Sequence, residues 1–373
     1  MHILLLSAYD TASHRSWCQG LIQHLSQHQW CYLTLPGRYF SWRIRGNPLS
    51  WALGEQAAQL RQPFDLIVAT SMVDVATLKG LIPSLANTPT LVYFHENQFA
   101  YPDSPEQFNS LEPQMVNLYS ALAADQVVFN SHYNQATFCQ GVDDLLKKMP
   151  DHAPRQTTLT QLARSQVLPV PIQTPATAGT RPQAWLPGTA RPLKLVWNHR
   201  WEYDKGPDTL AALCRLVDQA QLPIEIFILG HSFRRWPNAM TELRDMPALC
   251  VQHMGTLDSA DAYFECLAQA DVVLSTALHE FQGLAVLEAC SLGCHPLVPD
   301  RLAYPEWVPE KQRYTSTPQQ PEREAQAILA MLQNWLVHGL PERPDTGHYA
   351  WNQLSPVYDK LLSEVAAKPV ISV

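Results

Sequence analysis

The stretch DVVLSTALHEFQGLAVLEACSLGCHPLV, residues 271–298, decides the fold of this chain. It opens with an apolar strand pattern at Asp271–Ser275 and closes with another at His295–Val298. Between them, Gly283–Leu292 has the length and the apolar spacing of a helix. A strand, a helix and a second strand in this order predict two parallel strands with the helix packed on one face of the sheet.

The same alternation continues through the 373 residues and restarts once. The strands expected in the first half are His2–Ala8, Trp30–Leu35, Phe64–Thr70, Thr90–Phe94, Asp125–Phe129 and Gln166–Val170. The second half adds Leu193–Asn198, Ile224–Leu229 and Cys250–His253 before the stretch quoted above. Helical patterns fall at Ser13–Gln27, Pro207–Gln219, Ser259–Ala268, Glu322–His338 and around Tyr349–Leu362. Such alternation predicts parallel sheets that are covered on both faces.

A segment rich in Pro, Thr and Ala at residues 169–192 separates the two halves and has the composition of an exposed hinge. We therefore predict an α/β protein of two doubly wound, Rossmann-like domains, residues 1–175 and 190–345, that face each other across a cleft. A last helix, at about residues 346–365, is expected to pack back on the first domain. Ligands of such sheets bind outside the carboxyl ends of the strands, which places the expected site in the cleft.

Composition excludes several classes of protein. A net charge of −8 argues against a general nucleic-acid coat protein but not against a local basic patch. Eight cysteines without a C-x-x-C spacing predict a reduced, cytoplasmic protein without a zinc site. We expect no membrane span and no signal peptide, because the apolar run at the start is far too short for a span and lacks a basic flank. Without a G-x-G-x-x-G, a P-loop, an Asp-x-Asp pair, an H-E-x-x-H or a G-x-S-x-G, we expect neither a cofactor nor a metal.

Two glutamates bracket the start of the helix in the quoted stretch. Glu288 is the only formally charged side chain between Phe281 and Pro299, and its helical position is apolar. A buried carboxylate costs several kcal/mol unless it is paired. Glu280 lies at most about 12 Å away, and the helix start at Gly283 offers free N–H groups to an anion. This favours a polyhydroxylated ligand held at two points; the alternative is a Glu at a helix start and a Glu buried against an arginine.

Other polar residues follow the expected strands. Arg200 and Lys205 lie after Leu193–Asn198, where two cations can bind a diphosphate, unless they are simply solvated. His95 and Asn97 follow Thr90–Phe94, where a histidine can bond a sugar hydroxyl or belong to an ordinary polar turn. The remaining candidates at strand ends are Ser13, His14 and Ser131, the last of which can instead cap a helix.

One cluster combines cations with aromatic rings. It covers Arg38–Arg45, includes Trp42 and Arg43, and is expected on a loop. Such interleaving suits a nucleic-acid backbone with stacked bases. A loop that packs its aromatic rings inward is the alternative.

The pair Glu280…Glu288, the pair Arg200…Lys205 and the two-domain layout resemble the retaining GT-B glycosyltransferases with an E-x7-E motif. A second set of strings looks like the tRNA-queuosine alpha-mannosyltransferase family. They are YFHENQ (Tyr93–Gln98), VFNS (Val128–Ser131), MPDH (Met149–His152), HRWEYDK (His199–Lys205), HEFQG (His279–Gly283) and YPE (Tyr304–Glu306). The resemblance implies metal-independent, retaining transfer of mannose from GDP-mannose to the cyclopentene diol of queuosine at the wobble position of tRNA-Asp.

The resemblance also implies roles for single residues. Arg200 and Lys205 would neutralise the diphosphate, and His95 would lie beside the reacting sugar. The expected donor contacts are completed by Glu280, Phe281, Gly283, Leu284 and Glu288, with Glu280 on the mannose hydroxyls and Glu288 on the ribose. The expected acceptor or tRNA contacts are Ser13, His14, Trp42, Arg43, Arg45, Asn97 and Ser131. The glycine-rich turn usual after the first strand is absent from Tyr9–His14.

Three other functions remain open from the sequence. The same fold can transfer a sugar to a lipid, a glycan or a small molecule, although no basic amphipathic helix for a lipid surface is evident. It can also isomerise a sugar nucleotide without any acceptor, or bind one as a silent regulator. An isomerase would convert the sugar nucleotide with no acceptor present, whereas a transferase requires an acceptor, so this requirement distinguishes the two.

Overall fold

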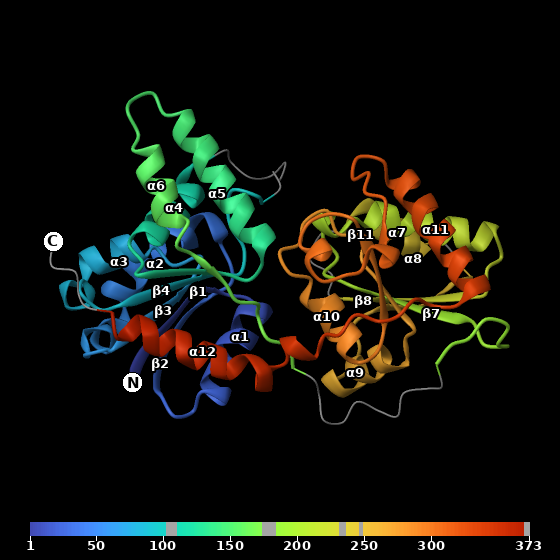
Figure 1. The fold of residues 1–373 in the computed structure, drawn as a ribbon, viewed down its shortest axis with the longest axis horizontal. Helices are drawn as coiled ribbons and strands as arrows, with labels where there is room; N and C mark the ends of the chain where they lie inside the picture. Colours follow the sequence, from blue (N-terminus) through green and yellow to red (C-terminus); the bar gives the residue numbers. More distant parts are fainter. Residues whose placement is uncertain (102–109, 174–183, 231–235, 246–248, 369–373) are drawn as a thin grey trace. The chain divides into compact units, whose positions relative to one another are not determined.

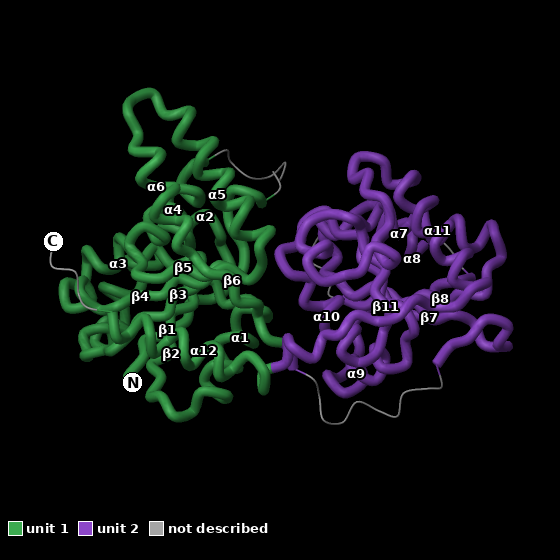
Figure 2. Tube along the Cα trace, viewed as in Figure 1, with its two compact units in different colours: residues 1–171, 351–373 green, residues 172–350 purple. Residues whose placement is uncertain are grey.

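The computed structural model describes residues 1–101, 110–173, 184–230, 236–245 and 249–368. The chain forms two compact units, shown in different colours in Figure 2. Unit 1 comprises residues 1–171 and 351–373, and unit 2 comprises residues 172–350. Part of the predicted hinge, residues 174–183, lies outside the described residues.

Unit 1 is built on a six-stranded sheet in the order β2-β1-β3-β4-β5-β6, and every neighbouring pair is parallel. The strands are β1 (His2–Asp10), β2 (Gln29–Pro36), β3 (Leu66–Thr70), β4 (Thr90–Phe94), β5 (Gln126–Phe129) and β6 (Gln166–Val167). The helices are α1 (Ala12–His24), α2 (Phe40–Ala52), α3 (Val75–Leu81), α4 (Glu112–Leu122), α5 (His132–Lys147), α6 (Arg155–Leu162) and α12 (Trp351–Ala366).

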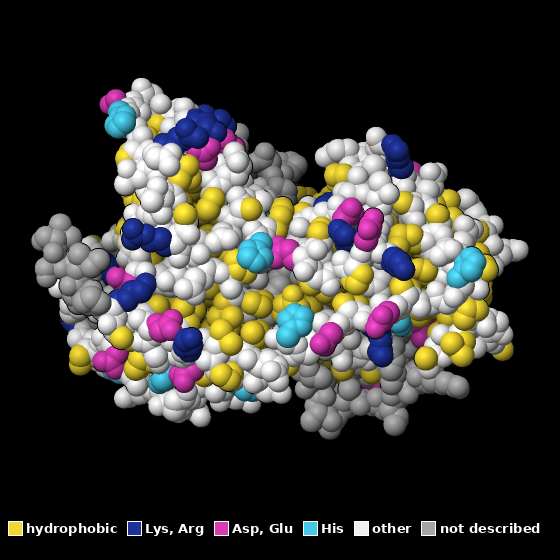
Figure 3. Space-filling view, in the orientation of Figure 1, with side chains coloured by type: hydrophobic (Ala, Val, Ile, Leu, Met, Phe, Trp, Pro, Cys, Tyr) yellow, Lys and Arg dark blue, Asp and Glu magenta, His cyan; other side chains and the backbone are white. Residues whose placement is uncertain are grey.

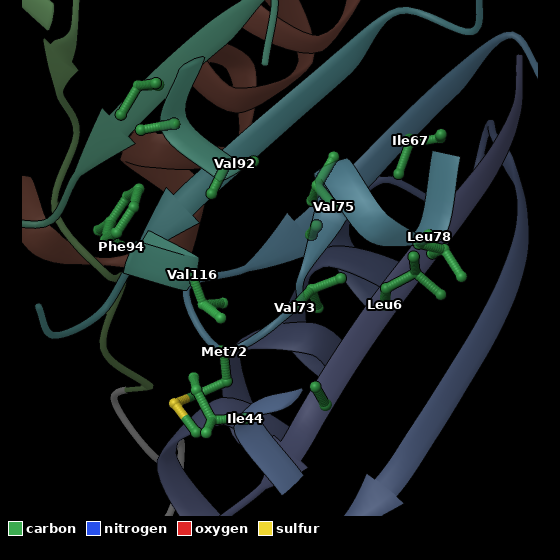
Figure 4. Close-up of a cluster of buried hydrophobic side chains, with 14 of the residues drawn as sticks. Leu6, Ile44, Ile67, Met72, Val73, Val75, Leu78, Val92, Phe94 and Val116 are labelled. Atoms are coloured by element: carbon green, nitrogen blue, oxygen red, sulfur yellow. The ribbon is translucent and has the colours of Figure 1, made fainter. Parts of the chain in front are cut away.

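One face of this sheet packs on α2, α3 and α4 through a large apolar cluster. The cluster includes Leu6 and Phe94 of the strands, Ile44 of α2 and Val116 of α4, all labelled in Figure 4. β3 and β4 are buried throughout their lengths, as expected for parallel strands that are covered on both faces. This packing fixes where the carboxyl ends of the strands meet.

The other face of the sheet is covered by α1 and α12, so the end of the chain belongs to the first unit (Figure 1). The indole N–H of Trp17 donates to the hydroxyl of Tyr358 at 3.1 Å, and that hydroxyl lies 3.1 Å from the carbonyl of Pro169. The two helices approach closely at Gly20, where an added Cβ would lie 2.0 Å from the ring of Trp351. A larger residue at position 20 would push α12 off the sheet.

Unit 2 repeats the design with a parallel sheet in the order β12-β11-β10-β7-β8-β9. The strands are β7 (Leu193–Asn198), β8 (Ile224–Leu229), β9 (Val251–Gly255), β10 (Val272–Leu274), β11 (His295–Pro299) and β12 (Arg313–Tyr314). The helices are α7 (Pro207–Gln219), α8 (Asn238–Asp245), α9 (Ala260–Gln269), α10 (Leu284–Ser291) and α11 (Pro321–His338). The predicted α/β class with two parallel, doubly wound sheets is confirmed.

Several local predictions need correction. The Arg38–Arg45 cluster was predicted on a loop, but α2 begins at Phe40 and continues through Pro48. A proline inside the segment and poor apolar periodicity hid this helix from sequence reasoning. The strand expected at Gln166–Val170 contains only two paired residues. Among the described helices, none combines the length and the apolar character needed to cross a bilayer.

Candidate functional site

The most highly charged buried group of unit 2 surrounds Lys205, which follows β7 and directly precedes α7. Its side chain is held by a short 3-10 turn, Tyr203–Lys205, and only 7% of the residue is exposed. The Lys205 Nζ donates to the carbonyl of His279 at 2.7 Å and lies 3.2 Å from the Asp204 carboxylate and 3.4 Å from that of Glu280. Strand order therefore brings together two loops that are about 75 residues apart in sequence.

The electrostatics of this group favour full ionisation. Burial lowers the pKa of Lys205, but the charges of Glu280 and Asp204 outweigh it and leave that pKa above its ordinary value. Burial raises the pKa of Glu280, but Lys205, His199 and His279 reverse this and bring it to about 2. At neutral pH the pair is thus a charged lysine facing a charged carboxylate, a combination that burial alone would forbid.

The start of α10 lies beside Glu280. The backbone N–H of Phe281 donates to the Glu280 carboxylate at 3.2 Å, while the Phe281 ring is buried against His279 with centroids 4.6 Å apart. Gly283 adopts φ +83°, and a Cβ there would lie 2.8 Å from the ring of Tyr304. The turn therefore requires glycine, and Leu284 begins the helix directly after it. Gly283 itself provides no side-chain cap, but its backbone N–H bonds the Glu280 carboxylate and helps to lower the pKa of that group, so the helix start already holds one anion.

Glu288, in the middle of α10, has a neutral partner. The hydroxyl of Tyr263 in α9 donates to its carboxylate at 3.0 Å, and the side-chain amide of Asn198 donates to the same hydroxyl at 2.7 Å. Burial raises the pKa of Glu288, and the Tyr263 hydrogen bond only partly offsets this. The side chain that bonds Glu288 is therefore Tyr263, and not the arginine considered as an alternative. Tyr263 is a residue that sequence reasoning missed, because it lies 25 positions before Glu288 on another helix.

Arg200 differs from Lys205 in its surroundings. Its side chain is 49% exposed and forms an ion pair with Glu202 at 3.1 Å. Its charge nevertheless lowers the pKa of Lys205, so the two cations lie within electrostatic range of one another. The structure thus brings Arg200 near the buried group without fixing it to Glu280.

In unit 1, a chain of polar residues crosses the carboxyl ends of β1, β3 and β4. The carboxylate of Glu96 lies 3.0 Å from the Nε2 atom of His14 and accepts the hydroxyl of Ser71 at 2.9 Å. Burial raises the pKa of Glu96, but the neighbouring His14 lowers it to about 2. Burial lowers the pKa of His14, yet Glu96 raises it above its ordinary value. Sequence reasoning gave Glu96 no role, although it lies between two residues that it did select.

His95 is the neutral member of this group. Its ring is buried, lies 4.3 Å from the ring of His14 and 4.7 Å from those of Trp17 and Tyr93, measured between centroids. Burial and the charge of His14 lower its pKa well below the ordinary value. Within the described part of the chain, neither of its ring nitrogens has a hydrogen-bond partner. A neutral imidazole with both nitrogens unsatisfied is suited to bind a polar ligand.

Comparison with known proteins identifies the family of this chain. A family model described as the N-terminal part of tRNA-queuosine alpha-mannosyltransferase matches residues 2–172. A Drosophila melanogaster tRNA-queuosine alpha-mannosyltransferase is 32% identical over 322 residues, which is 85% of this chain and 84% of the relative. The chain belongs to the tRNA-queuosine alpha-mannosyltransferase family. A second model, for group 1 glycosyl transferases, matches residues 193–334, and the protein is a glycosyltransferase.

Solved structures confirm the predicted GT-B fold. A sucrose-phosphate synthase from Thermosynechococcus elongatus superposes with a TM-score of 0.68 at 17% identity, covering 98% of this chain and 99% of that one. An E. coli structure described as trehalose-6-phosphate bound with UDP-2-fluoro glucose gives a TM-score of 0.65 at 13% identity, with the same two coverages. Identities this low carry the fold and nothing further.

Several predicted acceptor residues of this glycosyltransferase are engaged in its fold. The side chain of Asn97 donates to Asn134 at 2.8 Å, and Ser131 caps α5 by accepting the N–H of Asn134 at 3.0 Å. The hydroxyl of Ser13 lies 3.2 Å from that of Thr11 in the exposed turn after β1. The capping role weighed for Ser131 is therefore present. Contact of these three residues with an acceptor stays a prediction.

The cationic and aromatic cluster lies at the start of α2. Trp42 is 52% exposed and Arg43 is 8% exposed, whereas the guanidinium of Arg45 forms an ion pair with the buried Asp74. The cluster is therefore part solvent-facing and part buried, which neither sequence alternative described. No group of His, Cys, Asp and Glu able to hold a metal occurs among the residues that the structure describes. Metal independence itself stays a prediction.

Proposed function

We propose that this glycosyltransferase moves mannose from GDP-mannose to the cyclopentene diol of queuosine at the wobble position of tRNA-Asp, with retention at the anomeric carbon. The observation that carries the proposal is the buried, charged Lys205 between Glu280 and Asp204, beside the uncapped start of α10, in a chain of this family. Membership supplies the acceptor and the sugar, since the Drosophila relative is named for both.

Apart from His95, the proposed donor contacts come from unit 2. The diphosphate would bind Lys205, the exposed Arg200 and the N–H of Leu284 at the start of α10, while the N–H of Gly283 bonds the Glu280 carboxylate. Glu280, which is ionised at neutral pH, would accept hydrogen bonds from mannose hydroxyls. Phe281 would contribute through its backbone, because its ring is buried.

Glu288 would bind the ribose of the nucleotide. Two hydroxyl groups on adjacent carbons are donors that a carboxylate accepts well. The side chain that bonds it, Tyr263, is neutral, so the other carboxylate oxygen can accept a ligand hydroxyl without breaking an ion pair. A nucleoside is therefore a better match for this glutamate than a second anion.

The proposed chemistry needs no nucleophile from the protein. The bond between C1 of mannose and the phosphate oxygen breaks while the acceptor oxygen bonds to C1 on the same face. The acceptor proton passes to the departing phosphate oxygen, which leaves GDP and a mannosylated nucleoside. Lys205 and Arg200 would stabilise the charge that develops on the phosphate. Neutral His95 would hydrogen-bond the reacting sugar through a nitrogen that is otherwise unsatisfied.

The acceptor contacts would come from unit 1, from His14, Asn97, Ser131 and Ser13 at the strand ends and from Trp42, Arg43 and Arg45 at α2. We also propose that the enzyme works in the cytoplasm, which is supported by a tRNA substrate and by eight free cysteines that suit a reducing compartment. We propose further that the enzyme works without a metal, because paired cations can neutralise the diphosphate.

The decisive test is a transfer assay. The protein is incubated with GDP-mannose and queuosine-bearing tRNA-Asp, and the digested nucleosides are weighed by mass spectrometry. We expect queuosine to gain one hexose, and tRNA that carries guanosine at the wobble position to gain none. The Glu280→Ala variant should fold but lose turnover, since the donor sugar would no longer be held.

Two further arms address the alternatives. Consumption of GDP-mannose without tRNA, with conversion to another sugar nucleotide, would support an isomerase in place of a transferase. Hexose transfer to a lipid, a glycan or a metabolite with none on queuosine would keep the enzyme class and refute the acceptor. Full activity in the presence of excess chelator would agree with metal independence.

A further inference from the structure

The start of α2 has features that its role in the fold does not explain. Tyr39, the residue before the helix, adopts φ 57° and ψ 56°, a left-handed conformation that is unfavourable for a tyrosine. Its carbonyl accepts the N–H groups of Trp42 and Arg43, at 3.1 and 2.8 Å. No side chain caps the helix and no acidic residue lies in its first turn, so the N–H groups before Trp42 face no anion of their own helix.

Arg43, in the first turns of α2, is a buried cation without a counter-ion. The residue is 8% exposed, and its buried Nε atom has no hydrogen-bond partner in the described part of the chain. No carboxylate among the described residues forms an ion pair with it, and the charge that acts on it, that of Arg38, is positive. Burial and Arg38 together lower the pKa of its guanidinium. A largely buried guanidinium without a carboxylate partner is costly, so an anion that bonds its outer nitrogens would stabilise it.

The geometry of a helix directs this side chain to the same place as the free N–H groups. Side chains of a helix lean toward its N-terminus, so the Arg43 guanidinium extends back along α2 toward Tyr39. The electrostatic influence of Arg38, which lies just before the helix, agrees with this direction. Two independent kinds of donor, backbone amides and a buried guanidinium, thus converge at the start of α2.

Two exposed aromatic rings flank this point. Tyr39 is 70% exposed and Trp42 is 52% exposed, and the guanidinium of Arg38 lies 5.5 Å from the centre of the Tyr39 ring. The Trp42 ring occupies the space beside Gly46, where an added Cβ would lie 2.5 Å from it. The indole is therefore held against the helix while half of it remains accessible. Exposed rings beside a cationic groove are typical of surfaces that bind single-stranded nucleic acid.

We propose that the start of α2 binds the unpaired strand of the acceptor RNA, with one backbone phosphate on Arg43 and the first-turn N–H groups and with neighbouring bases stacked on Tyr39 and Trp42. This rests on the proposed function, in which the acceptor is a tRNA loop. The phosphate supplies the counter-charge that Arg43 lacks, and the left-handed conformation of Tyr39 holds its ring outward beside that phosphate.

Other cationic groups of the chain suit this role less well. Figure 3 shows Lys and Arg side chains gathered with acidic ones over α5 and α6. There Lys147 and Arg155 share Asp143, and Lys147 also pairs with Asp144, so two carboxylates balance the two cations. At α2 itself, Arg45 is balanced by Asp74. Arg43 and Arg38 are the cations of this surface that have no carboxylate partner among the described residues.

The test measures tRNA affinity over a range of salt concentrations for the full-length protein and its variants. Arg43→Gln should weaken binding about tenfold and reduce the slope of log affinity against log salt by about one, as expected for the loss of one phosphate contact. Because it removes an uncompensated buried charge, it should not lower thermal stability. Arg61→Gln, which removes an exposed charge from the same unit, is the matched control and should change neither quantity.

A second variant separates binding from folding. Tyr39→Gly relieves the left-handed strain, so its unfolding temperature should equal or exceed that of the wild type, while its tRNA affinity falls about fivefold. Wild-type affinity in both Arg43→Gln and Tyr39→Gly would overturn the inference. Equal competition by single-stranded and duplex RNA would overturn the stacking on Tyr39 and Trp42. If the variants behave as expected but the wild type transfers no hexose, the proposed function fails and the RNA surface remains.

Discussion

Replacement of Lys205 by methionine tests the electrostatic account of unit 2. The substitution keeps the length of the side chain and removes the only lysine or arginine shown in an ion pair with Glu280 among the described residues. The buried carboxylate of Glu280 then has no cation beside it, and Asp204 loses a contact of 3.2 Å. We expect the variant to fold with a large loss of stability at neutral pH.

The size of the loss follows from the pKa of Glu280. The environment lowers it from an ordinary 4.5 to about 2, and each whole step in pKa corresponds to about 1.4 kcal/mol. The charged form is thus favoured by about 3 kcal/mol, chiefly because of Lys205. Removal of one member of a buried ion pair costs about 3–5 kcal/mol in general, so the two routes agree.

The loss should also depend on pH in a defined direction. Because the pKa of Glu280 is lowered in the folded wild type, its stabilising contribution is complete above pH 4.5 and disappears as the pH falls toward 2. In the Lys205→Met variant burial raises that pKa instead, so the carboxylate destabilises the fold until it takes up a proton. The difference between the two proteins should therefore be largest near pH 7 and shrink in acid.

Urea unfolding of the full chain, followed at several pH values, provides the assay. Addition of Glu280→Gln to Lys205→Met should recover part of the lost stability, because it removes the unpaired charge. Lys311→Met, at an exposed position of the same unit, should change stability by less than about 0.5 kcal/mol. A loss under 1 kcal/mol for Lys205→Met, or no recovery in the double variant, would show that the ion pair does not have the assigned role.

Three further predictions concern single contacts. Gly283→Ala should destabilise the protein by about 2–4 kcal/mol and raise the KM for the donor, because the alanine would adopt a left-handed backbone conformation and its Cβ would clash with the buried ring of Tyr304. An unchanged free energy of unfolding and unchanged kinetics would contradict this. Tyr263→Phe removes the hydroxyl that donates to Glu288, so the pKa of that carboxylate should rise further and the KM for the donor should increase more steeply than in the wild type as the pH falls. A pH profile identical to that of the wild type would refute the link. Tyr358→Phe should lower the free energy of unfolding by about 1–3 kcal/mol, because a buried indole N–H loses its acceptor, whereas the exposed neighbour Val357→Ala should have little effect.

Much of the fold could be predicted because it depends on local patterns. The βαβ stretch at residues 271–298 forms β10, α10 and β11, with each boundary displaced by at most one residue. Apolar runs of strand length between helical patterns suffice for this. The start of α2 could not be predicted in the same way, because Pro48 and the polar residues of its first turns mask its periodicity.

Only some residues of the candidate site could be predicted from the sequence. Lys205 and His95 were selected because each follows an expected strand, and such ends meet at one edge of a parallel sheet, whereas Glu280 was selected because it lies just before an expected helix. Their partners could not be read from the chain. Glu96 bonds His14 from 82 positions away, and Tyr263 reaches Glu288 from another helix. These contacts depend on strand order and helix packing, and a single sequence contains no direct signal for either.

The contacts of Lys205 also bear on how a cation can serve a phosphate while it is buried. A lysine at 7% exposure would ordinarily lose its proton readily, and a neutral amine would be of little use to an anion. Asp204 and Glu280 prevent this by raising its pKa, and the carbonyl of His279 accepts one of its protons at 2.7 Å. The ammonium is therefore charged and oriented before any donor arrives. Because Glu280 lies at 3.4 Å, longer than a good charged hydrogen bond, a phosphate oxygen can approach Lys205 more closely than this carboxylate does, and the lysine need not move to accept it.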